Sequence, residues 1–327
     1  MFKGVFQRSH YIFTIPNLDA NETNIISVKI FDHEGEDYYV LNISVPPNQT
    51  DWWNSDWNYR IPITLNSAES LTDYQILIKL NSSNFNFSKA KANGEDIRFI
   101  DGNKELSYWI EEWSPTNAKI WIKADVSGMK EIYMYYGNPD ASSASNGAST
   151  FEFFDDFNGQ TIMETIAQPY GDPLVCGYPN NVYFSNDGSS EIIELRCLDE
   201  GELTKTLNLP SNTYKITSKW DVRSSNEGSY SSASYAHFDE VYGASANLPH
   251  RLIVVGTSKI WEKYGALSDG YSEITEVEYT GPIETVRLAF GSSAWDYYYR
   301  TAYDYVLIRK YTSSEPSVSI GEEENIS

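Results

Sequence analysis

Cysteine, histidine and basic residues are scarce in this chain, and long apolar runs are missing. Its 327 residues include two cysteines and four histidines. No run reaches the roughly 18 apolar residues of a membrane-spanning helix, and the opening "MFKGVFQRSH" lacks the apolar core of a signal peptide. The histidines belong to no H-E-x-x-H or G-x-S-x-G motif, and neither a C-x-x-C pair nor a glycine-rich phosphate loop occurs. The sequence therefore argues against transition-metal, serine-hydrolase and nucleotide sites.

The charge is strongly of one sign. Lysine and arginine total 24 against 46 aspartates and glutamates, so the formal net charge is -22. A surface this acidic repels phosphate backbones, which argues against nucleic-acid binding. It attracts cations, so bound calcium is one interpretation, and solubility alone is the other.

Aromatic residues are abundant, and 25 tyrosines dominate the 15% aromatic content. Together with many Ser, Thr and Asn residues, this is typical of secreted β-proteins. N-x-S/T sequons crowd the first ninety residues and recur at the end of the chain. They lie at Asn21, Asn42, Asn48, Asn81, Asn86 and Asn325. We expect an extracellular, cell-surface chain that is glycosylated at the first five, and a piece of a longer exported protein whose signal and anchor lie outside it.

Cys176 and Cys197 flank two predicted strands joined by the turn "NDGSS". A hairpin would bring them together, and in an extracellular chain a disulfide is the expected state. Two buried free thiols are the alternative.

The first segment, residues 1–46, contains three runs of period two: "YIFTIPNL", "TNIISVKIFD" and "DYYVLNISV". This pattern predicts a strand meander. It resembles the C-terminal half of an immunoglobulin-like or polycystic-kidney-disease-type domain, and is too short for a complete sandwich. Either the domain is truncated or a partner chain supplies its missing strands. Residues 47–56 are a linker.

Residues 57–148 hold short alternating runs that are spaced as in a β-sandwich. In order they are "WNYRIPITL", "LTDYQILIKL", "EDIRFID", "ELSYWIEEW", "AKIWIKADV" and "IYMYYGNPDASSASNG". This order resembles the family of domain of unknown function 2341, which occurs on archaeal and bacterial surface proteins. That family has no established catalytic residues, so the resemblance implies none here.

Residues 149–322 carry about ten further predicted strands, and residues 323–327 form a tail. The opening "FEFFDDF" and the closing "DYVLIRK" are similar to the first and last strands of concanavalin A-like (laminin G-like) domains. The resemblance implies a two-sheet jelly roll. The predicted fold class is therefore all-β, with tandem β-sandwiches.

The aromatic-basic cluster at the start of the second segment invites a binding interpretation, but alternation argues otherwise. Trp57 and Tyr59 share a face with Ile61, Ile63 and Leu65. We therefore expect this face to pack into the core. Arg60 points to the other face, where we expect it to pair with Asp96 or Asp101.

Paired acidic residues can act as catalytic groups. In "YWIEEW", alternation places Trp109, Glu111 and Trp113 on one face, so a structural role is expected. Glu276 and Glu278 share a strand face but do not match the spacing of a β-glucanase. Calcium requires six to eight oxygens. Asp155 and Asp156 on the first strand and Asp304 on the last could contribute to such a site, or could cap turns and pair with nearby basic residues.

Aromatic-rich stretches suggest sugar stacking. The candidate residues are Trp261, Tyr264, Trp295 and Tyr297, and their alternative role is core packing. The leading hypothesis is a non-enzymatic adhesive or glycan-binding module whose partner is a cell-surface glycan or a neighbouring surface protein. The alternatives are a structural subunit assembled by strand complementation and a carbohydrate-active hydrolase.

Overall fold

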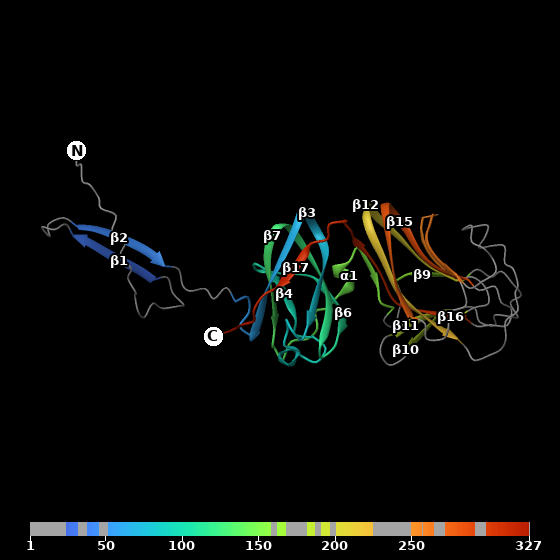
Figure 1. Ribbon diagram of the computed structural model, residues 1–327, viewed down its shortest axis with the longest axis horizontal. Helices are drawn as coiled ribbons and strands as arrows, with labels where there is room; N and C mark the ends of the chain where they lie inside the picture. The colour runs from blue at the N-terminus through green and yellow to red at the C-terminus, as the bar shows by residue number, and fades with distance from the viewer. Residues whose placement is uncertain are drawn as a thin grey trace, which may run out of the picture. The chain divides into compact units, whose positions relative to one another are not determined.

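The structure, a computed structural model, describes residues 24–31, 38–45, 52–157, 162–167, 182–186, 191–196, 201–224, 250–256, 258–264, 272–291 and 299–326 (Figure 1). Strands dominate these ranges, with only the short helices η1 (Phe87–Lys89) and α1 (Gly147–Thr150). The predicted all-β class is confirmed. The chain divides into two compact units, Met1–Asp56 and Trp57–Asn325.

In the first unit the structure describes one antiparallel pair, β1 (Asn24–Phe31) and β2 (Tyr38–Val45). These are two of the three strands predicted there, and the "YIFTIPNL" run lies outside the described residues. A two-stranded hairpin buries little apolar surface and is marginally stable by itself.

The second unit begins with a seven-stranded sheet ordered β17-β3-β7-β4-β5, with β18 also on β3 and β6 also on β7. Its strands are β3 (Tyr59–Asn81), β4 (Arg98–Asp101), β5 (Lys104–Glu105), β6 (Tyr108–Trp113), β7 (Asn117–Tyr136), β17 (Ser317–Ile320) and β18 (Glu324–Asn325). The long strands β3 and β7 pair from Tyr59↔Tyr136 to Asn81↔Asn117, with register shifts on both sides of Leu71. The apolar face of β3 packs into one core with β4, β6 and β7.

The opening cluster of this unit locks the core, as alternation predicted. Trp57 is buried, and so are Ile61, Ile63 and Leu65 on the continuing face of β3. The Trp57 indole N–H donates to the carbonyl of Asp96 at 2.6 Å.

Arg60 does not pair as predicted. Its Nε lies 2.7 Å from Glu324 Oε2, and its guanidinium lies 4.1 Å from the centre of the Tyr133 ring. The two predicted acids bind other groups. Asp101 pairs with Lys130 at 2.5 Å, and the Asp96 carboxylate accepts backbone N–H groups. The correct acid arrives on β18, opposite Arg60, which local sequence cannot show.

The buried carboxylate of Asp96 joins three segments of the chain. It accepts the backbone N–H groups of Lys91 at 2.9 Å and of Gly137 at 2.7 Å. Gly137 has a φ of 84°, and an added Cβ there would lie 2.5 Å from the Tyr59 ring. Asp96 therefore holds a turn that only glycine can make.

We expect Asp96→Ala to destabilise the second unit, because it leaves two N–H groups without acceptors. The expected loss is roughly 1–3 kcal/mol for each N–H group, measured by urea unfolding. Asp101→Ala is the matched control. It breaks the more exposed pair with Lys130 and should cost about 1 kcal/mol or less. Equal losses for the two variants would contradict this role of Asp96.

The alternation predicted for β6 holds for Trp109 and Glu111 and is wrong beyond Glu111. Pairing with β7 runs Ile110↔Ile120 and then Glu112↔Lys119, so one residue, Glu111, is extra in β6. This bulge reverses the facing. Trp109 packs on Phe151 and Phe154, whereas Trp113 packs in the first core against Phe85 and Phe87.

A second sheet of nine strands follows, ordered β10-β11-β16-β12-β15-β13-β14, with β8 on β16 and β9 on β12. Its strands are β8 (Phe153–Asp155), β9 (Glu164–Ala167), β10 (Val182–Asn186), β11 (Glu191–Arg196), β12 (Gly201–Ser224), β13 (His250–Val255), β14 (Ser258–Tyr264), β15 (Ser272–Gly291) and β16 (Tyr299–Lys310). The predicted first and last strands, β8 and β16, are neighbours, with Asp155 opposite Val306. The concanavalin A-like resemblance stays a prediction.

An aromatic cluster joins the two sheets within the second unit. Trp121, Phe151, Phe154, Tyr305 and Leu307 form its buried part. Glu111, the bulged residue, accepts the Trp121 indole N–H at 2.8 Å and the Tyr305 hydroxyl at 2.9 Å. The bulge thus aims a carboxylate at polar groups of both sheets.

The end of the chain returns to the first sheet. The sequence prediction assigned residues 149–322 to the second sandwich, but β17 pairs with β3 from Ser317↔Asn66 to Ile320↔Ile63, and β18 follows. In Figure 1, β17 is drawn in red beside β3. The residues predicted as a tail, 323–327, include β18. The nine-stranded sheet is therefore inserted between strands of the seven-stranded one.

Candidate functional site

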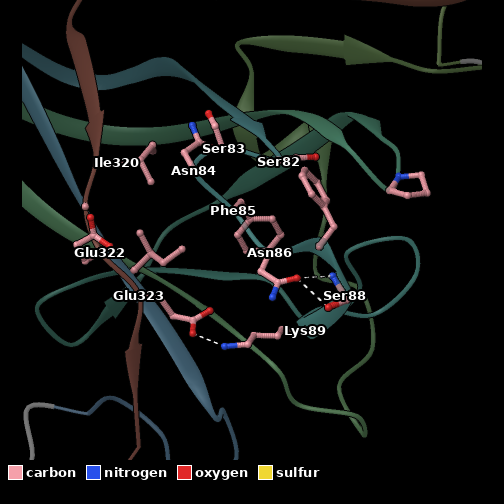
Figure 2. A pocket seen from close by; sticks show the side chains of 14 residues that line it. Ser82, Ser83, Asn84, Phe85, Asn86, Ser88, Lys89, Ile320, Glu322 and Glu323 are labelled. Atoms are coloured by element: carbon pink, nitrogen blue, oxygen red, sulfur yellow. Dashed lines mark hydrogen bonds and ion pairs between the residues drawn. The ribbon is translucent and has the colours of Figure 1, made fainter.

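A groove of about 640 Å³ opens on the seven-stranded sheet (Figure 2). One wall is the loop Ser82–Lys89, which follows β3, and the other is the C-terminal segment Ile320–Glu323. Ile61 and Pro115 complete the lining. Two segments more than 230 residues apart in sequence thus build one concave surface.

Two asparagine turns shape the first wall. The Asn81 side-chain oxygen accepts the Ser83 backbone N–H at 2.9 Å and the Ser83 hydroxyl at 2.5 Å. The Asn86 oxygen accepts the Ser88 N–H at 3.2 Å and the Ser88 hydroxyl at 2.7 Å. Phe85 is buried between the two turns, so the loop is anchored while its amides and hydroxyls stay at the surface.

A bulge at Pro62 shapes the second wall. Pro62 has no N–H to donate to a neighbouring strand. The register shifts by one residue between Ile320↔Ile63 and Glu324↔Arg60, and the Gly321 N–H donates to the Pro62 carbonyl at 2.8 Å. Because the C-terminal strand bulges here, Glu322 and Glu323 line the groove.

The charges of the groove are partly neutralised. Lys89 forms an ion pair with Glu323 and lies 4.4 Å from the centre of the Tyr59 ring. The Tyr136 hydroxyl donates to Glu323 at 2.6 Å. Burial acts to raise the pKa of Glu323, but the hydrogen bonds from Lys89 and Tyr136 outweigh it, and the pKa is lowered. Glu322 is exposed. Because the lining holds one lysine and two glutamates, its net charge is negative.

The groups of this lining are suited to hydrogen bonding and to packing against a ring. The groove lining contains neither histidine nor cysteine. The Ser83 and Ser88 hydroxyls donate to side-chain amides rather than to a base. A general acid needs a raised pKa at neutral pH, whereas that of Glu323 is lowered. The groove offers hydroxyls, amides, carboxylates and the half-buried ring of Phe87.

Two of the residues predicted to stack on sugars lie on the nine-stranded sheet. Trp261 and Tyr264 belong to β14, opposite Ile253 and His250 of β13. Trp295 and Tyr297 lie outside the described residues. A sugar-binding role for these four residues stays a prediction.

The predicted calcium ligands have protein partners. The Asp155 carboxylate accepts the N–H groups of Phe157 at 2.9 Å and of Ile162 at 3.0 Å. Asp304 forms an ion pair with Lys219, and exposed Asp156 follows β8. Within the described ranges, no three His, Cys, Asp or Glu residues gather as a metal site. Calcium binding stays a prediction.

Of the modification sites, Cys176, Cys197, Asn21 and Asn48 lie outside the described residues. Asn42 lies in β2 opposite Ser27, and Asn325 lies in β18 opposite Tyr59. Asn81 is the last residue of β3, directly before the groove loop, and Asn86 lies on that loop. Sequence reasoning did not find the groove itself. Its only local signals were the two closely spaced sequons and a proline inside an alternating strand.

Comparison with known proteins supports part of the family resemblance. Residues 93–167 match a family described as Domain of unknown function (DUF2341). An uncharacterised protein of Methanocaldococcus jannaschii is 31% identical over an alignment of 121 positions, which covers 31% of this chain and 22% of that protein. The chain thus spans about a fifth of the length of this relative.

Solved structures with similar strands include a carbohydrate-binding module in complex with β-1,4-galactotriose (10% identity, TM-score 0.24, 40% of this chain and 81% of that chain). Tandem carbohydrate-binding modules of a Streptococcus pneumoniae glycoside hydrolase are 11% identical, with a TM-score of 0.29 and 79% of each chain covered. At such scores these likenesses carry no information on ligand or activity.

Over the described residues, no helix is long and apolar enough to cross a membrane.

Proposed function

We propose that this chain is a non-catalytic extracellular module that binds a neutral glycan in the groove between Ser82–Lys89 and Ile320–Glu323. The observation that carries the proposal is the lining itself. It combines serine hydroxyls and asparagine amides with carboxylates and one half-buried aromatic ring. The volume of about 640 Å³ lies within the range of roughly 300–1,000 Å³ that is usual for small-molecule sites.

Each chemical group of the groove has a counterpart on a sugar. Sugar hydroxyls both donate and accept, so they match serine and asparagine side chains. The Glu322 carboxylate accepts hydrogen bonds, and the apolar face of a sugar ring suits the Phe87 ring. Because Glu323 takes the positive charge of Lys89, a ligand with carboxylates or sulfates would meet net repulsion.

Hydrolysis is not part of the proposal. Glu276 lies 3.8 Å from Lys215, and both Glu276 and Glu278 are exposed on β15. In the groove, the hydrogen bonds from Lys89 and Tyr136 lower the pKa of Glu323, which disfavours Glu323 as the acid of a carboxylate pair.

Glycan-array screening and calorimetry on the full chain made in bacteria, which is unglycosylated, test this function. We expect binding of neutral oligosaccharides without turnover. Glu322→Ala should weaken binding at least tenfold, since a lost hydrogen bond to a charged group costs about 1.5–3 kcal/mol. Phe87→Ala should weaken binding about tenfold, because it removes the apolar surface on which a sugar ring would pack. The control Glu284→Ala changes an exposed glutamate of β15 and should bind normally. Retention of full affinity by both groove variants would refute the site.

Surface localisation and adhesion are further parts of this proposal, supported by the composition and the sequons. A calcium titration in the same calorimetric assay checks the ion predicted at Asp155, Asp156 and Asp304. Strand complementation through the first unit ranks second, and only the two-stranded sheet β1-β2 supports it.

A further inference from the structure

Asn86 lines the groove and is also a potential glycosylation site. It begins the sequon Asn86-Phe87-Ser88, and all three residues line the groove. Asn81, the last residue of β3, begins a second sequon that runs into the groove loop, but Asn81 is not part of the lining. The site that is shaped for a sugar therefore contains an acceptor for one.

The turn at Asn86 leaves its amide nitrogen available. The side-chain oxygen is engaged by the Ser88 N–H and hydroxyl, and in Figure 2 the nitrogen points away from Ser88. No hydrogen bond among the described residues uses this nitrogen, and Asn86 is exposed. The hydrogen bond from the Ser88 hydroxyl thus fixes the amide with its oxygen toward Ser88 and its nitrogen away from it.

The described sequons differ in this respect. Asn42 and Asn325 lie in paired strands, whereas Asn86 lies outside the strands, directly before η1. Asn81 has the same turn as Asn86 but a different position, which makes it the natural internal comparison.

We propose that Asn86 carries an N-linked glycan and that the first sugars of this glycan lie in the groove. The chain's own glycan is then the occupant of the site. In the transfer step, Asn86 Nδ2 attacks the anomeric carbon of a lipid-phosphate-linked oligosaccharide. The N–C bond forms, the C–O bond to phosphate breaks, the lipid phosphate leaves with the electron pair, and a base of the transferase takes one Nδ2 proton.

The groove suits such an internal ligand. Phe87 follows the attachment point directly, Glu322 faces it from the other wall, and Lys89 is held by Glu323. Attachment would place the sugar at high effective concentration next to these groups. This inference rests on the proposed affinity of the groove for neutral sugars.

The first test is occupancy. The full chain, secreted from a host with an N-glycosylation pathway, is digested and its glycopeptides are analysed by mass spectrometry. We expect glycan on Asn86, its loss in Ser88→Ala and its retention in Ser88→Thr, which preserves the sequon. A bare Asn86 in a preparation whose Asn21 or Asn48 is glycosylated would overturn the proposal.

The second test is location, and it does not depend on binding of free glycan. Hydrogen exchange is compared between wild-type chain from the glycosylating host and wild-type chain from bacteria. An attached glycan in the groove should slow exchange at least threefold in both Ser82–Lys89 and Ile320–Glu323. Slower exchange in Ser82–Lys89 alone would overturn the proposal that the glycan lies in the groove.

A binding comparison separates this proposal from the proposed function. Glycosylated wild-type chain should bind free glycan at least tenfold more weakly than the bacterial chain. Equal affinity of the two would overturn the internal occupant and leave the glycan-binding function intact. If the bacterial chain binds no glycan while exchange slows on both walls, the proposed function fails and the internal glycan stands.

Discussion

Raising the pH above about 10 is expected to destabilise the second unit steeply. Three buried tyrosines, Tyr74, Tyr136 and Tyr305, have pKa values raised above the ordinary value, first by burial and then by a neighbouring glutamate. In the unfolded chain their pKa values return to about 10. Below that pH both states keep the phenolic protons and the stabilising contribution is complete. Above it the unfolded chain loses these protons first, so the unfolded state becomes more stable relative to the folded state and the free energy of unfolding falls.

The expected slope follows from linkage. For each of the three phenols, the free energy of unfolding should fall by up to about 1.4 kcal/mol per pH unit once the pH exceeds about 10. Urea unfolding followed by tryptophan fluorescence between about pH 8 and about pH 11 measures it. Tyr136→Phe should flatten the slope by one phenol's share. Tyr279→Phe is the control, because the Tyr279 hydroxyl donates to a backbone carbonyl instead. An unchanged slope in Tyr136→Phe would be incompatible with this account.

These phenols are placed where distant segments join. Each donates its hydroxyl to a glutamate far away in the sequence. The pairs are Tyr74–Glu315 at 2.8 Å, Tyr136–Glu323 at 2.6 Å and Tyr305–Glu111 at 2.9 Å. When such a phenol ionises, two negative charges face each other in a partly buried site. Alkaline unfolding should therefore begin by separating the C-terminal strands and the second sheet from the first sheet.

Ending the chain after Glu315 is expected to destabilise the second unit by roughly 3–5 kcal/mol. The deletion removes β17 and β18 and exposes the edge of β3. It removes the partly buried Val318 and Ile320 from the core. It also takes Glu324 from the buried Arg60 guanidinium, and removal of an ion-pair partner from a buried charge is costly.

The deletion also removes one wall of the groove, so glycan binding should disappear with it. Thermal and urea unfolding of the full and shortened chains measure the stability change. Removal of only the last two residues is the control, since β18 ends at Asn325, and it should shift stability by less than about 0.5 kcal/mol. A shortened chain that unfolds at the same urea concentration as the full chain would show that β17 and β18 are dispensable.

Glu324→Gln distinguishes the contribution of the Glu324 charge to stability from that of the strand β18. It keeps β18 and its backbone pairing while removing the negative partner of Arg60. The Glu324 side chain is 42% exposed, so water compensates in part, and the expected loss is about 1 kcal/mol. A much larger share of the deletion's effect should therefore come from the lost strands.

The sequence by itself determined the β-class, most of the strands and the core face of β3. Ile61, Ile63 and Leu65 alternate with outward residues, and a period of two has one physical meaning in an extended chain. The match of residues 93–167 to DUF2341 also follows from ordered local motifs. Such features depend only on neighbours along the chain, so they can be read without the fold.

The tertiary structure alone decided the partners across long separations. The acid for Arg60 was open between Asp96 and Asp101, yet Glu324 fills the role because β18 returns to β3. The bulge at Glu111 reversed the facing of Trp113, since a bulge is set by pairing with β7 rather than by the strand's own pattern. The groove needs Lys89 and Glu323, which are 234 residues apart. A contact between segments so distant depends on the global path of the chain, and no local periodicity encodes that path.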